Sequence, residues 1–444
     1  MDELPRKLGF GDATLIIIGI VIGSGIFLLP TLIARNLASP WAIIAVWVVS
    51  GLLSCCGALA YAELGAMKPA TGGQYVYLRD AYGPWCAFLC GWVFVLAVLP
   101  GGIAFMAVGF SIYLDQFVPH IAGMRTAVAL SLVAALSAVN YIGVKEGAWI
   151  QRIFTSLKIA GLVLVIGAAA LAPHTRDAAE PVVQPLSYTG IGVAMTACLM
   201  AYNGWSYLSF VAGEVKDPQR NLPKSLVLGM GAVMALYVSA NLAYLRVMSV
   251  PEIAATERVG AELAQRTMGP AGATVLSAVV LASIIGAING CILTAARIPF
   301  AQARDGIFFR RFGRMHPRFE TPGFAIVALG LWTGVLIVTG SFETLASYTM
   351  LSAWVFYTLT VASVWVLRRK APEAPRPYKM WGYPVTLWLF IIVSIWFLAD
   401  ALVNHPKTSG IAIAVAASGI PFYFFWRRKS VAEQRSARKP STLA

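Results

Sequence analysis

Long apolar segments constrain this chain more than any other feature of its sequence. Residues 40–60, 226–245 and 385–401 are nearly free of charge and approach the ~20 residues that an α-helix needs to cross a bilayer. Only 12% of the residues are charged, whereas a soluble domain usually carries about 25%. Apolar and polar residues do not alternate in blocks of ~10 residues, which argues against an outer-membrane barrel. The sequence therefore predicts an all-α integral membrane protein.

Twelve transmembrane helices can be placed along the chain. They cover residues 10–35, 40–66, 84–115, 124–141, 150–171, 189–213, 222–248, 271–300, 322–340, 343–367, 380–402 and 408–426. If the N-terminus is cytoplasmic, seven of the 34 Lys and Arg residues fall in external segments, Lys158 falls inside a span, and the other 26 fall in cytoplasmic segments. This asymmetry follows the positive-inside rule and predicts a multi-pass protein of the cell (inner) membrane with both termini in the cytoplasm. It also explains the net charge of +14 without nucleic-acid binding.

The composition gives no sign of a metal site, a disulfide framework or a second domain. The six cysteines lie in or beside apolar spans, and the four histidines show no metal-ligand spacing. No small-residue cleavage site follows the first apolar run, so we do not interpret it as a signal peptide. We expect a single membrane domain over residues 1–444, without a cofactor, and with a disordered basic cytoplasmic tail at 427–444.

Two of the spans are interrupted near their centres. The first contains Gly23-Ser24-Gly25, and the sixth contains Asn203-Gly204-Trp205. Glycine costs about 1 kcal/mol against alanine inside a helix, and unpaired backbone groups cost several kcal/mol in a bilayer. Spans one and six each begin a five-span half, and breaks at corresponding places in two halves indicate the midplane site of a transporter. The alternative is that these small residues only pack helices together.

The free backbone groups at such breaks would suit an α-amino acid. A helix that starts near Ile26 exposes amide N–H groups at its positive end, which favours a carboxylate. Those amides belong to Ser24, Gly25 and Ile26. Carbonyl groups near Val21, Met200 and Asn203 would accept hydrogen bonds from an ammonium group. We therefore predict a substrate site between the two breaks.

Four sequence blocks in a fixed order carry a family resemblance. The first break reads GSGIF, and residues 201–226 read AYNGWSYLSFVAGEVKDPQRNLPKSL. The other two blocks are YAELGAMKPATGGQYVYLRDAYGP at 61–84 and NGCILTAARIPFAQARDGIFF from residue 289. Together they resemble the amino acid–polyamine–organocation (APC) transporter superfamily, most closely a stand-alone bacterial member of its L-type amino acid transporter branch. The resemblance implies a LeuT-type 5+5 inverted repeat at 10–171 and 189–367, two additional helices at 380–426, and alternating access.

The resemblance also assigns roles at the breaks. It places the substrate carboxylate on the amides of Ser24 and Gly25, and the ammonium on the carbonyls of Val21, Met200 and Asn203. Relatives often carry an aromatic gate at the position of Met200. Because methionine departs from that pattern, we name Tyr202 and Trp205 as further candidates for the gate.

Several positions bear on substrate charge and size. Family members that handle cationic substrates can carry an acid at the position of Asn203, and heteromeric relatives often carry a basic residue at that of Leu99. Both side chains are neutral here, and an unpaired charge would be costly in a low-dielectric site, so we expect neutral substrates. Gly101 and Gly102 are candidates for leaving room for the substrate side chain, although a glycine pair is also an ordinary packing device.

Lys158 lies eight residues beyond Ile150, or roughly 12 Å along a helix. It resembles the lysine that replaces a sodium ion between spans one, five and eight, and would then bind carbonyls near Gly23. We name Ser283 as a candidate partner on span eight, with Ala287 as the alternative position. The lysine could stay charged or carry a proton in the cycle. Snorkelling of its ammonium to the surface is the competing interpretation.

The favoured function is sodium-independent exchange of neutral L-amino acids, and the alternative is proton-coupled amino acid import. An intramembrane enzyme is not expected, because the sequence shows no nucleophile with a base and no metal set. A channel or receptor would not explain paired breaks. The loop after span three contains no cysteine, so we expect no disulfide-linked heavy subunit. Glu63 could be a proton site, but a salt bridge is the favoured role.

Overall fold

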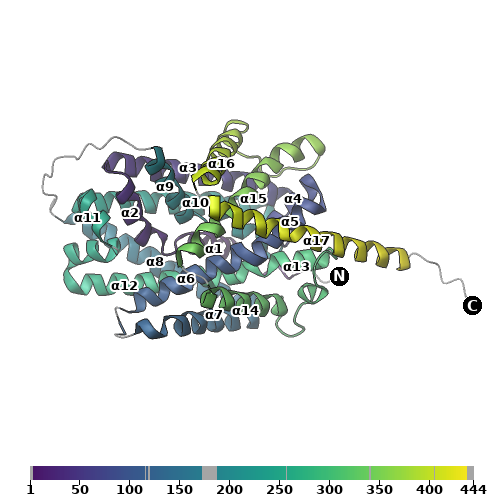
Figure 1. Cartoon of the computed structure of the whole chain (residues 1–444), viewed down its shortest axis with the longest axis horizontal. Coiled ribbons are helices and arrows are strands. Elements are labelled where there is room, and N and C mark those ends of the chain that lie inside the picture. The colour runs from purple at the N-terminus through teal and green to yellow at the C-terminus, as the bar shows by residue number, and fades with distance from the viewer. Residues whose placement is uncertain are drawn as a thin grey trace, which may run out of the picture.

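Helices make up nearly all of the secondary structure in the computed structural model (Figure 1). The structure describes residues 4–115, 117–118, 121–172, 188–256, 258–339, 342–404 and 406–437. Within those ranges there is no β-sheet, and one isolated parallel bridge joins Leu8 to Val215. The predicted all-α class is therefore confirmed.

The helices follow one another with short connections. Those before residue 173 are α1 (Phe10–Val21), α2 (Gly25–Asn36), α3 (Pro40–Met67), α4 (Gln74–Tyr82), α5 (Pro84–Val93), the π-helix η1 (Phe94–Val98), α6 (Leu99–Leu114), the 3₁₀-helix η2 (Ile121–Met124), α7 (Arg125–Ile142) and α8 (Val144–Leu171). Those after residue 187 are α9 (Tyr188–Ala201), the 3₁₀-helix η3 (Trp205–Glu214), α10 (Pro218–Val247), α11 (Val250–Ala255), α12 (Val259–Ala295), α13 (Arg297–Arg304), the 3₁₀-helix η4 (Arg310–Gly313), α14 (Gly323–Thr339), α15 (Phe342–Lys370), α16 (Val385–Asn404) and α17 (Pro406–Ala437).

Ten helical segments in the described part of the chain are long and apolar enough to cross a membrane. The α1–α2 pair counts as one of them, because its two helices are separated only by the first break. Of the other predicted spans, α14 is an apolar helix of 17 residues, and the sixth is divided between α9 and η3. Many apolar side chains on the outside remain exposed, among them Leu331, Ile392 and Val403. Such a surface fits contact with lipid.

The first helix lies at the centre of the bundle. Helix α1 packs against α8, α10 and α12, while α10 also packs along α3 and α12 along α8. Helices α8 and α12 run side by side in Figure 1. The break after α1 is therefore surrounded by rigid helices on several sides.

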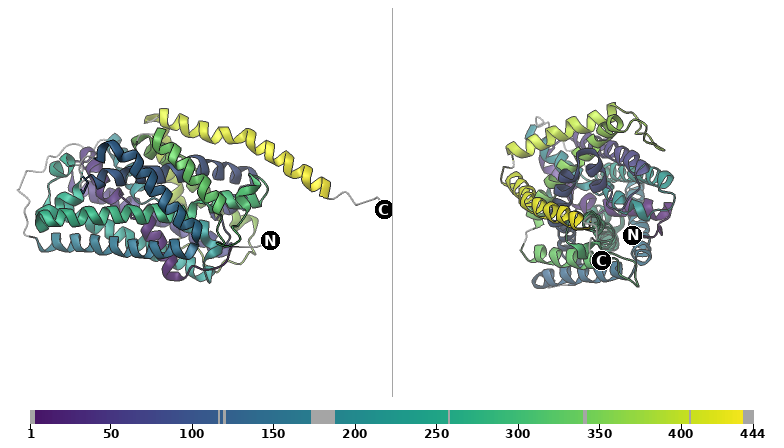
Figure 2. Two further views of the ribbon diagram at one scale, coloured as in Figure 1. Left: turned by 90° about the horizontal axis from the view of Figure 1, so that it is seen from below. Right: turned by 90° about the vertical axis from the view of Figure 1, so that its right-hand side faces the viewer.

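The last helix extends out of the bundle (Figures 1 and 2). Helix α17 continues to Ala437, so its end occupies part of the segment 427–444 that we predicted to be a disordered tail. Residues 438–444 of that segment lie outside the described residues. The start of α1 and the end of α17 lie toward the same end of the molecule.

Candidate functional site

The first break is a short non-helical turn. Helix α1 ends at Val21 and α2 begins at Gly25, and Ile22 leaves the helical region with ψ of 81°. The amide of Gly23 donates to the carbonyl of Val21 over 2.8 Å. No described residue accepts a hydrogen bond from the amides of Ser24, Gly25 or Ile26. These are the free donors that the sequence predicted at the start of the second half-helix.

The second break lies against the first. Helix α9 ends at Ala201, the amide of Asn203 donates to the carbonyl of Met200 over 3.2 Å, and η3 begins at Trp205. Gly204 has φ of 120°, which side chains rarely tolerate. A Cβ atom at Gly204 would also lie 2.7 Å from a methyl carbon of Ile20. Glycine is therefore needed here both for the turn and for the close approach to α1.

The two breaks line one cavity of about 90 Å³. Its walls are Ile20, Val21, Gly23, Ser24, Gly25, Leu29, Gly102, Phe105, Met106, Met200, Ala201, Asn203, Gly204, Tyr207, Cys291, Thr349 and Met350. The lining includes most of the predicted substrate-binding residues, but Ile26 is not part of it. Of the predicted glycine pair, Gly102 lines the cavity and Gly101 does not.

The aromatic gate candidates lie behind the cavity wall. Tyr202 is fully buried and packs edge-to-face on Trp47, with ring centroids 5.7 Å apart. Trp205 is also fully buried and packs on Tyr61 and Tyr357, with centroids 5.0 and 5.2 Å away. Neither ring lines the cavity, so the structure does not support our placement of the gate there. Interior aromatic packing of this kind accounts for their burial.

Lys158 connects three helices through its ammonium group. Its Nζ donates to the carbonyls of Gly19 at 2.8 Å, Ile22 at 2.6 Å and Ser283 at 2.8 Å. Three acceptors satisfy all three ammonium hydrogens. The side chain is fully buried, which excludes snorkelling in this conformation. Ser283 is the predicted partner on α12, but its carbonyl oxygen accepts the hydrogen bond from Lys158. Its hydroxyl donates instead to the carbonyl of Ile22 over 2.9 Å.

Two tyrosines form hydrogen bonds with the breaks, and the sequence analysis did not identify either of them. The hydroxyl of Tyr237 on α10 lies 2.8 Å from the carbonyl of Val21 and 3.3 Å from that of Ala201. The hydroxyl of Tyr357 on α15 donates to Oδ1 of Asn203 over 3.0 Å. A polar ring inside an apolar span is the signal that could have identified both. The hydroxyl of Thr349, which lines the cavity, has no hydrogen-bond partner in the described ranges.

A buried ion pair lies beyond the second break. Both guanidinium nitrogens Nε and Nη2 of Arg297 donate to the carboxylate of Glu214, over 2.8 and 2.9 Å, and each side chain is 1% exposed. Beside it, the amide of Leu8 donates to the carbonyl of Glu214 over 3.0 Å. The pair and this bridge fix the end of η3 to α13 and to the segment before α1.

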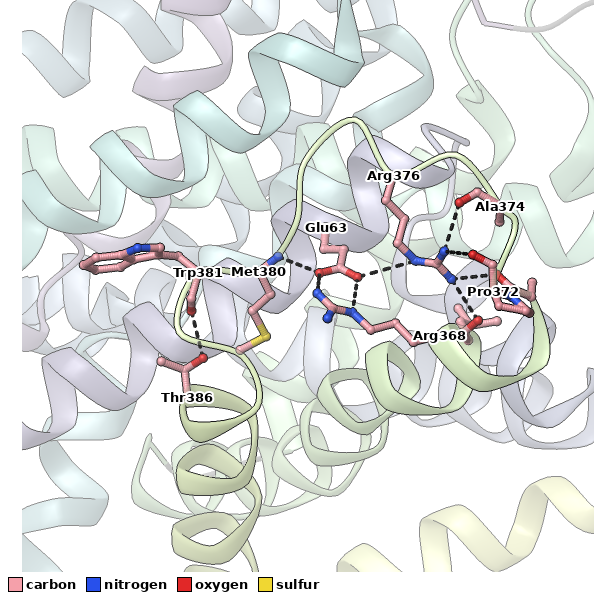
Figure 3. A network of polar contacts seen from close by, with 10 residues as sticks. Glu63, Arg368, Pro372, Ala374, Arg376, Met380, Trp381 and Thr386 are labelled. Carbon is pink, nitrogen blue, oxygen red and sulfur yellow. Dashed lines mark hydrogen bonds and ion pairs between the residues drawn. The ribbon is translucent and has the colours of Figure 1, made fainter.

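Glu63 anchors a polar network at the end of α15 (Figure 3). Arg368 donates from Nε and Nη2 to its two carboxylate oxygens, over 2.8 and 2.6 Å. The backbone amide of Met380 donates to the same carboxylate over 2.6 Å. The favoured salt-bridge role of Glu63 is thus confirmed, and the network joins α3 to α15 and to the loop that follows α15.

Sequence similarity relates this chain to one protein family and to individual known proteins. The model described as amino acid permease matches residues 8–423. The chain is 33% identical to the large neutral amino acids transporter small subunit 2 of Oryctolagus cuniculus, over 96% of this chain and 82% of the relative. It is 30% identical to the b(0,+)-type amino acid transporter 1 of Homo sapiens, over 99% and 92%. It is 29% identical to the serine/threonine exchanger SteT of Bacillus subtilis, over 96% and 98%.

Proposed function

The chain belongs to the amino acid permease family of the APC superfamily, and on that basis we propose that it exchanges neutral L-amino acids across the membrane by alternating access. The observation that carries the proposal is the pair of breaks around one cavity. The free amides of Ser24 and Gly25, both in the cavity lining, would bind the substrate carboxylate at the positive start of α2. The carbonyls of the first and second breaks would bind its ammonium group.

Neutral substrates are supported by the cavity lining. No residue among the described lining carries a charged side chain, and the amide oxygen of Asn203 already accepts the Tyr357 hydroxyl. A charged substrate side chain would therefore lose its hydration without gaining a counter-charge. At about 90 Å³ the cavity between the breaks is small. That size fits a small amino acid in this conformation.

Sodium independence is supported by Lys158. Its ammonium occupies three carbonyl oxygens contributed by α1, the first break and α12, the type of ligand that a sodium ion would need. A second cation at the same oxygens would be repelled by the ammonium charge. We propose that Lys158 is a fixed substitute for a coupling ion.

The organisation of the whole chain forms part of the proposal. It consists of twelve spans, with inverted repeats at 10–171 and 189–367 and two added helices at 380–426. The positive-inside asymmetry supports a cell-membrane protein with both termini in the cytoplasm. The loop after span three contains no cysteine, and four of the six cysteines are buried, which supports function without a disulfide-linked heavy subunit.

The test is counterflow in proteoliposomes that contain the purified chain. Vesicles loaded with serine, alanine, leucine or arginine should take up labelled neutral amino acid only when a neutral amino acid is inside, with or without sodium. Uptake by empty vesicles that follows an inward proton gradient would instead establish the alternative, proton-coupled import. Equal exchange of arginine and alanine would refute the argument from the uncharged cavity.

A further inference from the structure

A basic groove lies where α1 and α10 begin and where α15 has ended. Its volume is about 1000 Å³, and it is separate from the central cavity. Three exposed cations line it: Arg220, Lys224 and Lys379. Asp217 is the acid among the described lining residues, so the side chains of the groove carry a net charge of about +2. None of the three cations forms an ion pair with another described residue.

Two of these cations lie at the start of a helix, where positive charge is disfavoured. Arg220 and Lys224 lie in the first two turns of α10, a helix of 30 residues, and their spacing of four places them on one face. The start of a helix carries partial positive charge, which favours acids over bases. The first turn of α10 contains no acidic residue, and the one acid at the helix start is Asp217 at its N-cap. A bound anion would relieve this repulsion.

The opposite wall is held in place by the Glu63 network. The amide of Met380 is fixed on the Glu63 carboxylate, and the groove residues Lys379 and Trp381 flank it in the chain. Arg376 fixes the same loop by donating from Nη2 to the carbonyl of Ala371 over 2.7 Å. Figure 3 shows the Trp381 ring pointing away from this network. The wall that presents Lys379 and Trp381 is therefore preformed.

The groove continues from these charges onto an apolar surface. Val227 and Leu228, one turn beyond Lys224 on α10, are 42% and 56% exposed. Trp381 is 80% exposed, and tryptophan is enriched at the level of lipid headgroups. Helix α10 is long and apolar enough to span the membrane, so these side chains lie at its boundary.

From this combination we propose that the groove binds an anionic glycerophospholipid. The cations Arg220, Lys224 and Lys379 contact the headgroup phosphate, and the acyl chains lie along Val227 and Leu228. Basic pockets at the ends of membrane helices are suited to such headgroups. A free phosphate ion would use the same cations but would leave the apolar strip and the interfacial ring unused, so the lipid is the occupant that matches the whole groove.

The test measures lipid retention by the full chain in detergent, using native mass spectrometry with phosphatidylglycerol and phosphatidylcholine. Wild type should retain phosphatidylglycerol in preference to phosphatidylcholine. Each cation near the surface contributes about a fivefold change in affinity, so R220Q/K224Q/K379Q should bind phosphatidylglycerol roughly 100-fold more weakly. If that variant fails to fold, the three single variants should each show a loss of about fivefold.

The matched control removes three exposed cations elsewhere, as K145Q/R311Q/R314Q, and should leave retention unchanged. Equal retention by the groove variant and wild type would overturn the proposal, as would an equal loss in the control. Glycerol phosphate and inorganic phosphate are added as competitors. If either displaces phosphatidylglycerol at the same concentration as the lipid itself, the groove is a free-anion site and the lipid assignment is wrong.

Discussion

Replacing Lys158 with alanine should uncouple α8 from the first break. The carbonyl of Ile22 would keep a second donor, the Ser283 hydroxyl at 2.9 Å. The carbonyl of Gly19 would not, because the amide of Gly23, its normal helical donor, is bonded to Val21 instead. One unsatisfied buried carbonyl costs roughly 1–3 kcal/mol. At about 1.4 kcal/mol per tenfold change, substrate exchange should fall roughly 5- to 150-fold.

The assay is neutral amino acid counterflow by Lys158→Ala in proteoliposomes, between about pH 6 and 8. Lys145→Ala, an exposed lysine on the same helix, is the control and should exchange at the wild-type rate. Thermal unfolding of each variant in detergent separates loss of function from loss of fold. A fixed ammonium predicts that wild-type exchange is nearly independent of pH across this range.

Two results would refute the reasoning. Full exchange by Lys158→Ala would show that the three carbonyl contacts do not maintain the geometry of the break. Proton movement in proportion to substrate, present in wild type and lost in Lys158→Ala, would show that the lysine carries a proton. The second result would also favour the proton-coupled alternative over exchange.

Other substitutions test separate parts of the structure. Gly23→Ala should weaken substrate binding in calorimetry with little loss of fold, because its Cβ would face the cavity and meet only ordinary contacts at 3.9 Å; unchanged affinity would remove Gly23 from the site. Asn203→Asp should improve arginine exchange relative to alanine exchange by supplying a counter-charge, and an unchanged ratio in counterflow would contradict this. Glu214→Gln should lower the free energy of unfolding, measured with denaturant, by about 3–5 kcal/mol because it leaves a buried guanidinium without its counter-charge. The double variant Glu214→Gln/Arg297→Met should recover most of that loss. The pKa of Glu252 is lowered by the backbone amide at the start of α11 and by an arginine. The stability that this carboxylate gives the fold is therefore complete above the ordinary glutamate pKa and is lost as pH falls through the lowered value. Glu252→Gln should cost roughly 0.5 kcal/mol of folding free energy at pH 7, and the melting temperature of the variant should fall less steeply in acid than that of wild type.

The breaks were predictable from sequence because they contradict their surroundings. Glycines and an amide side chain inside spans that otherwise favour helix leave few interpretations, and a lysine deep in an apolar span needs carbonyl or acidic partners. These rules led to Gly23, Asn203 and Lys158, and the structure brings all three positions to the centre of the bundle. Their functional roles remain predictions.

Other features depend on geometry that one sequence does not encode. The π-helix Phe94–Val98 directly precedes α6, and of the glycine pair on α6 Gly102 lines the cavity whereas Gly101 does not. The 3₁₀ winding of η3 directs Trp205 into aromatic packing. Glu214 and Arg297 are 83 residues apart, and their pairing depends on the tertiary fold.

The Tyr237 contact makes the Val21 carbonyl a point of competition. An oxygen of this kind has two lone pairs, and both are already used, one by the Gly23 amide and one by the Tyr237 hydroxyl. A substrate ammonium that binds Val21 must therefore displace a donor. The Tyr237 hydroxyl has only one hydrogen and a second acceptor within reach, the carbonyl of Ala201 at 3.3 Å. Substrate binding would thus move the Tyr237 hydrogen bond from Val21 in the first half of the chain to Ala201 in the second half. Occupancy of the cavity would then change contacts in both halves.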